Sequence, residues 1–186
     1  MIPPEHKILI SPIGEWDSDL IKLISEKVQR AFGFQTKILQ LIKDKDMDFA
    51  FDPKRDQYHS TKILEKLARA APPLILKVLA ITEVDLFIPI LTHVYGEAQL
   101  GGKTSIISTH RLNKGSSLNF TKKTFLNRVV KEAIHELGHT FKLLHCKEKT
   151  CIMHYCRNVN DVDRKSDQLC RYCTIMLNDE IKRLEF

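Results

Sequence analysis

Apolar residues in the first 112 positions of the chain follow two kinds of pattern. Three continuous apolar runs have the length of buried strands: residues 7–13, 34–41 and 74–81. Two segments place apolar residues three and four positions apart, as one face of a helix requires: residues 17–32 and 58–70. Gly33 and the pair Pro72-Pro73 follow these segments and predict where the helices end, while the charged stretch 43–56 predicts a loop.

Two further β-like runs, residues 93–100 and 104–112, are separated only by Gly101-Gly102-Lys103, which predicts a β-hairpin. Strands that alternate with helices favour an α/β fold with a mixed, mostly parallel sheet, to which the hairpin adds an antiparallel edge strand. The run 93–100 is also a candidate edge along which an extended peptide could pair through its main chain. An ordinary edge strand would give the same pattern.

From about residue 121 the apolar positions again follow helical spacing, over a longer stretch. They are Phe125, Leu126, Val129, Val130, Ala133, Ile134 and Leu137. The pattern predicts one long amphipathic helix. This helix also carries the candidate chemistry.

Composition and charge are those of an ordinary soluble protein. The chain has 186 residues, 43% of them hydrophobic, which is enough for one core, so we expect a single domain over residues 1–186. Charged residues of both signs make up 28% of the chain, so the net charge of +6 describes a solvated surface and argues against nucleic acid as a partner. The chain start lacks the pattern of a signal peptide, and no apolar run approaches the ~20 residues that cross a bilayer. We therefore expect a cytoplasmic protein with no membrane partner; the pattern says nothing of its oligomeric state.

The long helix contains the motif His135-Glu136-x-x-His139. Two histidines four positions apart lie one turn apart on the same helix face, where both imidazoles can bind one metal ion. Glu136 lies between them, and its carboxylate can contact a zinc-activated water without binding the metal, as the general base of peptide hydrolysis does. The alternative is a helix whose histidines only form hydrogen bonds, or bind zinc without catalysis.

His145 is the candidate third metal ligand. Ten residues of continuous helix would place it about 15 Å along the axis from His135, so the helix must end before it. Such a break is usually made by glycine, which adopts a positive φ at no steric cost. This chain has Lys142 there, and a left-handed lysine costs about 1 kcal/mol, a strain that metal binding can absorb.

Four of the five cysteines form two close pairs, Cys146 with Cys151 and Cys170 with Cys173. This spacing is typical of a closed tetrahedral zinc site that stabilises a fold. In a reducing compartment, clustered thiols are more often metal ligands than disulfide partners. Four unrelated buried thiols are the alternative. Cys156 is left over, and we interpret it as a buried small residue.

Together these motifs resemble the archaemetzincin family of zinc metallopeptidases, within the metzincin clan. The resemblance rests on residues 135–173: the three histidines with Glu136, the two cysteine pairs, and Met153. It implies a zincin-like fold, a catalytic zinc on three histidines, a methionine-bearing turn beneath it, and a second, structural zinc on four cysteines. Residues 1–140 would then form the sheet and the active-site helix, and residues 141–186 a small zinc-stapled C-terminal part.

The third histidine and the first cysteine, His145 and Cys146, are adjacent in the sequence. They fit two different metals, because neighbouring side chains of an extended segment point to opposite sides. The cysteine site would then hold the loop that carries the third histidine.

Two features stand apart from the family pattern. Lys142 replaces the family's glycine, and the run Met153-His154-Tyr155 resembles the corresponding turn of the astacin branch of metzincins. By that resemblance, the Tyr155 hydroxyl can reach the open side of the zinc and stabilise the reacting oxyanion. The alternative is a ring packed under the metal, whose hydroxyl needs only one partner in the turn.

We expect the protein to hydrolyse bonds in peptide or protein substrates by means of a zinc-activated water, with Glu136 as general base. The alternative is a non-catalytic zinc module that binds peptide or nucleic acid, which would leave Glu136 unexplained. Binding to nucleic acid would show a steep dependence on salt concentration. An aminopeptidase would also need an acidic group for the substrate amine, and no residue identifies itself as that group.

Overall fold

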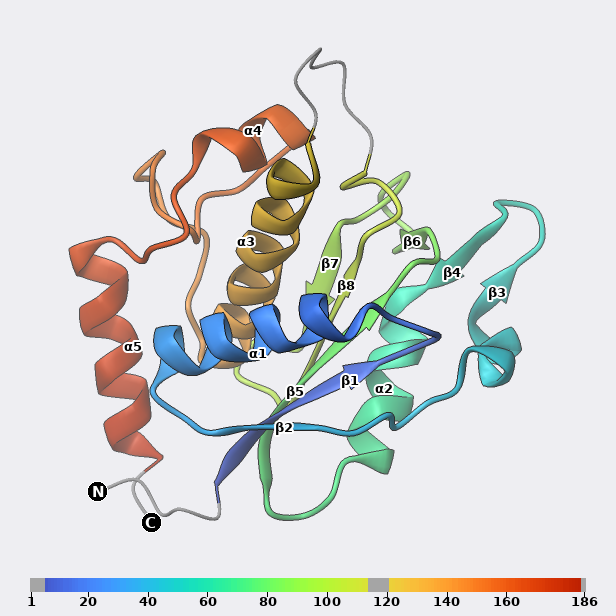
Figure 1. Ribbon diagram of the computed structural model, residues 1–186, viewed down its shortest axis with the longest axis horizontal. Helices are drawn as coiled ribbons and strands as arrows, with labels where there is room; N and C mark the ends of the chain where they lie inside the picture. Colours follow the sequence, from blue (N-terminus) through green and yellow to red (C-terminus); the bar gives the residue numbers. More distant parts are fainter. Residues whose placement is uncertain (1–5, 114–120, 185–186) are drawn as a thin grey trace.

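The computed structural model describes residues 6–113 and 121–184. Its main feature is a five-stranded sheet in the order β2-β1-β5-β8-β7 (Figure 1). These strands are β1 (Lys7–Pro12), β2 (Thr36–Ile38), β5 (Ile75–Thr82), β7 (Gly96–Ala98) and β8 (Thr104–Ser108). Neighbouring strands are parallel except that β7 runs antiparallel to β8, with Glu97 opposite Ile106. The mixed, mostly parallel sheet with an antiparallel edge strand is therefore confirmed.

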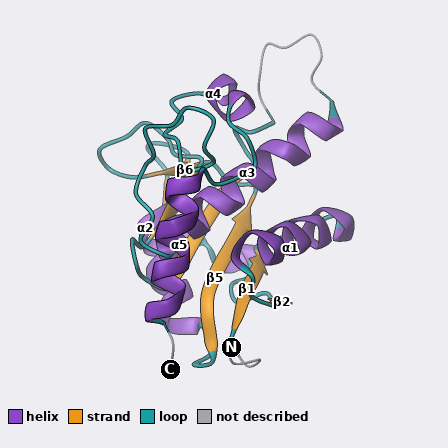
Figure 2. Cartoon of the chain, turned by 90° about the vertical axis from the view of Figure 1, so that its left-hand side faces the viewer, coloured by secondary structure: helices purple, strands orange, loops and turns teal. Residues whose placement is uncertain are grey.

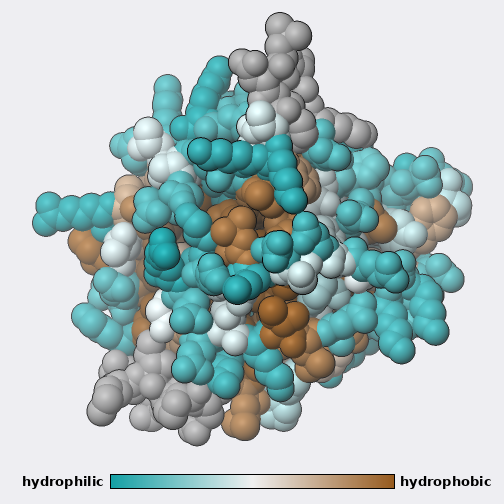
Figure 3. Space-filling model, viewed as in Figure 1, coloured by the Kyte–Doolittle hydropathy of each residue, from teal (hydrophilic) through white to brown (hydrophobic). Residues whose placement is uncertain are grey.

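Helices cover both faces of this sheet (Figures 1 and 2). The two on one face are α1 (Ser18–Phe32) and α3 (Lys122–Thr140), and the one on the other is α2 (Ser60–Ala70). Alternate residues of β1 face opposite sides, so that Ile8 and Ile10 pack in the core under α1 and α3, whereas Leu9 packs in the core under α2. The face that carries α1 is mostly hydrophilic, with apolar side chains in small patches (Figure 3).

Both predicted ends of the long helices are present. Gly33 follows α1 with a left-handed φ of 77°, and its amide donates to the carbonyl of Gln29, which ends the helix. Thr121 precedes α3, and its hydroxyl accepts a hydrogen bond from the amide of Thr124. The end of α1 and the start of the active-site helix α3 are therefore where the sequence predicts them.

A second, small sheet was not expected. Its strands are β3 (Phe51–Asp52), β4 (Gln57–His59) and β6 (Leu86–Phe87). The predicted loop 43–56 contains β3 and two short 3-10 turns, and the helix predicted over 58–70 begins only at Ser60. Tyr58 and His59 pair with β6 instead, so tertiary pairing overrides the helical pattern at these two positions.

The C-terminal part carries two helices that the apolar pattern did not predict, α4 (Val159–Arg164) and α5 (Arg171–Arg183). The segment before them contributes Cys151, Ile152 and Met153 to the core beneath α3, and α5 adds Cys173 and Leu177 to the same core. Figure 2 shows α5 in front of the sheet, beside α3. Within the described residues, no helix combines the length and the apolar character needed to cross a membrane.

Candidate active site and metal clusters

The structure brings the three predicted histidines together at the end of α3. The side chains of His135 and His139 project from successive turns, and their Nε2 atoms lie 3.1 Å apart. His145 joins them from the segment after the helix, and one ring nitrogen from each of the three lies within 4.8 Å of the others. The three candidate ligands therefore form one cluster.

Hydrogen bonds fix which nitrogen of each helical histidine faces the cluster. Nδ1 of His135 lies 2.8 Å from the carbonyl of Ile152, and Nδ1 of His139 lies 2.7 Å from the carbonyl of Leu143. A carbonyl oxygen can only accept, so both Nδ1 atoms donate and both Nε2 atoms carry a lone pair. Two lone pairs at 3.1 Å repel each other unless a cation lies between them. The cluster therefore fits a metal ion, with its ring orientations set from outside.

The protonation state of the three histidines also fits a metal ion. Burial lowers the pKa of His135 well below its ordinary value and lowers the pKa of His139 to about 4. Burial also lowers the pKa of His145, although this ring is the most exposed of the three. All three imidazoles are therefore neutral at pH 7, which is the form that binds metals.

The turn that delivers His145 has the conformation predicted for it. Lys142 has a left-handed φ of 61°. Its amide donates to the carbonyl of His139, and the amide of Leu143 donates to the carbonyl of Gly138, a pattern that closes the helix. A lysine thus takes the place of a glycine in a left-handed turn.

The side chain of Lys142 has a contact that a glycine could not make. Its ammonium forms an ion pair with Glu180 of α5, at 3.0 Å, and the Glu180 side chain is almost fully buried. The lysine stem also packs against Gly101, itself in a left-handed conformation. Lys142 therefore links the turn to α5 and to the hairpin between β7 and β8.

Another lysine caps the same end of α3 from the sheet. Lys77 of β5 donates to the carbonyls of Thr140 and Gly102, at 2.6 and 2.7 Å. A cation at a helix C-terminus is favourable because the carbonyls there carry partial negative charge. Burial nevertheless lowers the pKa of Lys77 to about 8. This cap holds the turn and the hairpin together.

Glu136 lines a cavity of about 330 Å³ whose walls also include His135, His145 and the first two residues of β7. Gly96 of β7 faces it so closely that a Cβ at that position would lie 2.6 Å from Glu136 Cγ and 2.6 Å from the carbonyl of Ile106. Burial, and then the neighbouring Glu132 carboxylate, raise the pKa of Glu136 well above its ordinary value. A divalent cation at the histidines would oppose this shift by favouring the carboxylate.

Two residues that the sequence analysis missed lie on the same cavity. Glu132 and Lys165 form an ion pair at 2.8 Å with both side chains almost fully buried, and Nζ of Lys165 lies 3.5 Å from Nδ1 of His135. Burial disfavours the charge on Lys165, but the Glu132 carboxylate outweighs this and raises the pKa of Lys165. Glu132 lies one helical turn before the motif, a signal that could have been used, whereas Lys165 has no local pattern.

Tyr155 and Cys156 also line this cavity. The Tyr155 ring is 49% exposed, and its centroid lies 5.1 Å from that of His145 in an edge contact. The ring therefore lies beside the third histidine and is half exposed, and its role, as oxyanion donor or as packing residue, stays a prediction. Cys156 is partly buried outside both clusters, and burial raises the pKa of its thiol to about 11.

Met153 packs against α3 at Gly138, the residue between Glu136-Leu137 and His139. It is fully buried, and its sulfur lies 2.5 Å from where a Cβ on Gly138 would be. A Cβ at position 138 would force the Met153 side chain to move. The glycine inside the motif therefore has a packing role.

The four paired cysteines form the second cluster. One sulfur from each of Cys146, Cys151, Cys170 and Cys173 lies within 4.8 Å of the others, and none is in a disulfide. Backbone amides of Glu148 and Cys170 donate to two of the sulfurs. Four converging sulfurs are the donor set of a structural zinc site. Adjacent His145 and Cys146 belong to different clusters, as predicted.

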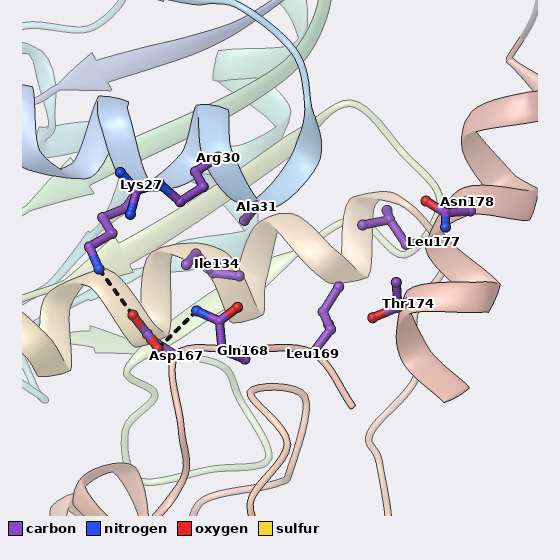
Figure 4. Close-up of a pocket in the computed structure, with 10 residues that line it drawn as sticks. All are labelled: Lys27, Arg30, Ala31, Ile134, Asp167, Gln168, Leu169, Thr174, Leu177 and Asn178. Atoms are coloured by element: carbon purple, nitrogen blue, oxygen red, sulfur yellow. Dashed lines mark hydrogen bonds and ion pairs between the residues drawn. The ribbon is translucent and has the colours of Figure 1, made fainter. Parts of the chain in front are cut away.

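A separate cavity of about 210 Å³ lies between α1, α3 and α5 (Figure 4). Its wall contains an ion pair between Lys27 and Asp167, at 3.1 Å, and its floor includes Ile134 and Leu177. Neither metal-type cluster contributes to it. The chemistry of the molecule is thus on the other side of α3.

Comparison with known proteins agrees with this geometry. The model of peptidase family M54 matches residues 29–179. The archaemetzincin of Methanocaldococcus jannaschii is 35% identical over 175 residues, which cover 93% of each chain. The archaemetzincin of Pyrococcus furiosus is 34% identical over 183 residues, covering 95% of this chain and 94% of that one.

Solved structures show the same fold. The crystal structure of archaemetzincin from Methanopyrus kandleri superposes with a TM-score of 0.82 at 31% identity, covering 98% of this chain and all of that one. A zinc-dependent peptidase from Methanocorpusculum labreanum superposes with a TM-score of 0.79 at 28% identity, covering 92% of this chain and all of that one. The chain therefore belongs to peptidase family M54, the archaemetzincins, and is a zinc metallopeptidase.

Proposed function

We propose that His135, His139 and His145 hold the catalytic zinc and that Glu136 is the general base of peptide-bond hydrolysis. The observation that carries this proposal is the placement of Glu136: its side chain is buried and lines the same cavity as His135 and His145, yet it is not a member of the histidine cluster. A group so placed can move protons without occupying a metal position.

The chemistry divides between the metal and this side chain. Zinc, when bound, polarises the substrate carbonyl and activates a water molecule. Glu136 takes a proton from the attacking water and later gives it to the departing amine. No covalent enzyme intermediate is required.

The substrate is a peptide, and β7 is its proposed support. This strand is at the edge of the five-stranded sheet, and Tyr95, Gly96 and Glu97 line the active-site cavity. An extended peptide can add to such an edge through main-chain hydrogen bonds. In this proposal the scissile bond lies near Gly96, the first residue of β7, because Gly96 faces Glu136 at close range.

The four cysteines, in this proposal, hold a structural zinc, and residues 1–186 act as one catalytic domain. The shared core supports this, because Met153 and Leu177 of the C-terminal part pack in the same cluster as Leu137 of α3. Five cysteines outside disulfides fit a reducing compartment such as the cytoplasm.

Substitution of Glu136 by glutamine tests the mechanism. It keeps the size of the side chain and removes the base, so turnover of a mixed peptide library should fall by about 10²- to 10⁴-fold with zinc content unchanged. The matched control is Glu26→Gln, an exposed position on α1. Turnover within a few-fold of wild type in purified Glu136→Gln, with the control also active, would refute the assignment. Product masses show whether cleavage is internal or removes the terminal residue.

A further inference from the structure

A groove adjoins the active-site cavity at the third histidine. It has a volume of about 650 Å³ and is lined by the segment 142–148 and the first turns of α5. His145 lines both the groove and the active-site cavity. His145 is therefore a wall residue that the groove shares with the cavity that would hold the peptide.

The groove carries exposed apolar side chains. Leu144 is 67% exposed, Tyr172 is 68% exposed and Met176 is 36% exposed, and all three belong to its lining. Large apolar side chains that gather at one exposed hollow are typical of a binding surface, and tyrosine and methionine are favoured there. We call these three residues the apolar groove.

The floor of the groove is the cysteine cluster. Cys146, Cys170 and Cys173 all line it, alongside the apolar residues. A site closed by four thiolates would fix both walls, because Cys146 belongs to the segment after α3 while Cys170 and Cys173 belong to the start of α5. A preformed hollow binds its ligand without losing conformational entropy of its own walls.

We propose that the apolar groove binds an apolar side chain of the substrate, on one side of the scissile bond only. The inference rests on the proposed function, since the occupant is the peptide that spans the zinc position. The continuity at His145 argues for the substrate as occupant. The second metal site thereby shapes substrate selection, in addition to holding the loop of the third histidine.

The test uses ten-residue alanine–serine peptides that carry a single leucine at each position in turn. Wild-type protein should prefer leucine at one or two positions on one side of the cleaved bond, by about 10-fold in kcat/KM, as expected for burial of one leucine side chain. In Leu144→Gln and Met176→Gln this preference should fall below about 2-fold, with unchanged cleavage of the leucine-free peptide. Ile175→Gln is the matched control, because Ile175 is a neighbour on α5, 50% exposed, and outside the groove lining.

A binding assay distinguishes a failure of this inference from a failure of the proposed function. If no peptide is cleaved, fluorescein-labelled leucine and leucine-free peptides are titrated onto the zinc-loaded Glu136→Gln protein, with and without Met176→Gln. Weaker binding of the leucine peptide on adding Met176→Gln would support the groove even though hydrolysis had failed. Equal leucine preference in wild type and in both groove variants would overturn it. So would a dimer, seen by sedimentation, that Met176→Gln dissociates, because a second copy would then cover the groove.

Discussion

The two clusters differ although they share neighbouring residues. The histidine cluster is built on a long helix anchored in the core, and it opens into a cavity bounded by Glu136, Tyr155 and the buried pair of Glu132 and Lys165. The cysteine cluster joins two chain segments at the start of α5, and the partners of its sulfurs are backbone amides. The histidine cluster is surrounded by groups that can move protons, whereas the groups that contact the sulfurs of the cysteine cluster are backbone amides that hold thiolates in place.

This difference separates two uses of a zinc ion in proteins. A metal that must exchange ligands during turnover needs an open position and ionisable neighbours, whereas a metal that stabilises a fold needs a full set of protein ligands. The histidine cluster offers three nitrogens and the cysteine cluster offers four sulfurs. The donor count alone therefore assigns the roles.

Chelation should produce the largest effect and tests the comparison directly. The purified protein should carry two zinc ions, and a mild chelator should remove the one on the histidines first, with complete loss of turnover and little loss of fold. Elemental analysis, peptide turnover and circular dichroism follow the three quantities. One zinc or fewer in fully folded, active protein would contradict the two-site description.

Acid should act on the histidine cluster in a defined window. An unfolded histidine takes up a proton near its ordinary pKa of 6.5, whereas burial holds the pKa of His139 at about 4 in the folded state. The unfolded state therefore binds more protons between these values, and stability is lost as the pH falls from 6.5 to 4. For His139 alone the loss is roughly 3 kcal/mol in metal-free protein.

Thermal unfolding of the metal-free protein at several pH values measures this loss. In cobalt-substituted protein, release of the nitrogen-bound ion, followed in the visible spectrum, should need a pH near or below 4, because protons must displace the ion from a histidine whose folded-state pKa is about 4. A melting temperature that stays flat between pH 6.5 and 4 would show that the buried histidine does not control the acid response.

Tyr155→Phe sharpens the comparison within the histidine site. The ring lies at the opening beside His145, so its hydroxyl can donate to the oxyanion of the tetrahedral intermediate. Removing it should lower kcat by about 100-fold or more, with little change in KM, and should leave both metals bound. Phenylalanine keeps the ring, so a variant within about threefold of wild type would leave Tyr155 as a packing residue.

The smallest effect concerns the turn between the two clusters. Lys142→Gly and Lys142→Ala both remove the ion pair with Glu180, but only alanine keeps a Cβ at a left-handed φ. The alanine variant should therefore be less stable than the glycine variant, by about 1 kcal/mol. Denaturant titration of the two proteins measures the difference. Equal stability would mean that the turn relaxes, and that the lysine at this position carries no backbone strain.

The sequence predicted most of the chemistry because its signals are local. The motif at 135–139 and the cysteine pairs are read from spacing alone, and the helix break before His145 follows from helix geometry, including the left-handed lysine. The role of Lys165 was not predicted, because it pairs with Glu132 across 33 positions of the sequence and no periodic pattern links the two residues.

The missed elements differ in cause. In α5, Cys173, Leu177 and Ile181 recur every four positions and pack against the core, a local signal that could have been used, but Cys173 was already interpreted as a metal ligand. In β4, two residues with helical spacing pair with β6 instead, a contact between distant segments. The pairing of β4 depends on a contact between residues far apart in the sequence, which local spacing does not reveal.

The adjacency of His145 and Cys146 makes the length of this segment more constrained than its composition. Each residue serves its own cluster because the chain alternates sides there. A single residue inserted between Lys142 and His145 would exchange the sides, turning an imidazole toward the thiolates and a thiol toward the open site. Point substitutions at Leu143 or Leu144 leave His145 and Cys146 each on its own side of the chain. Single-residue insertions and deletions should therefore be far less tolerated here than any substitution of the same size.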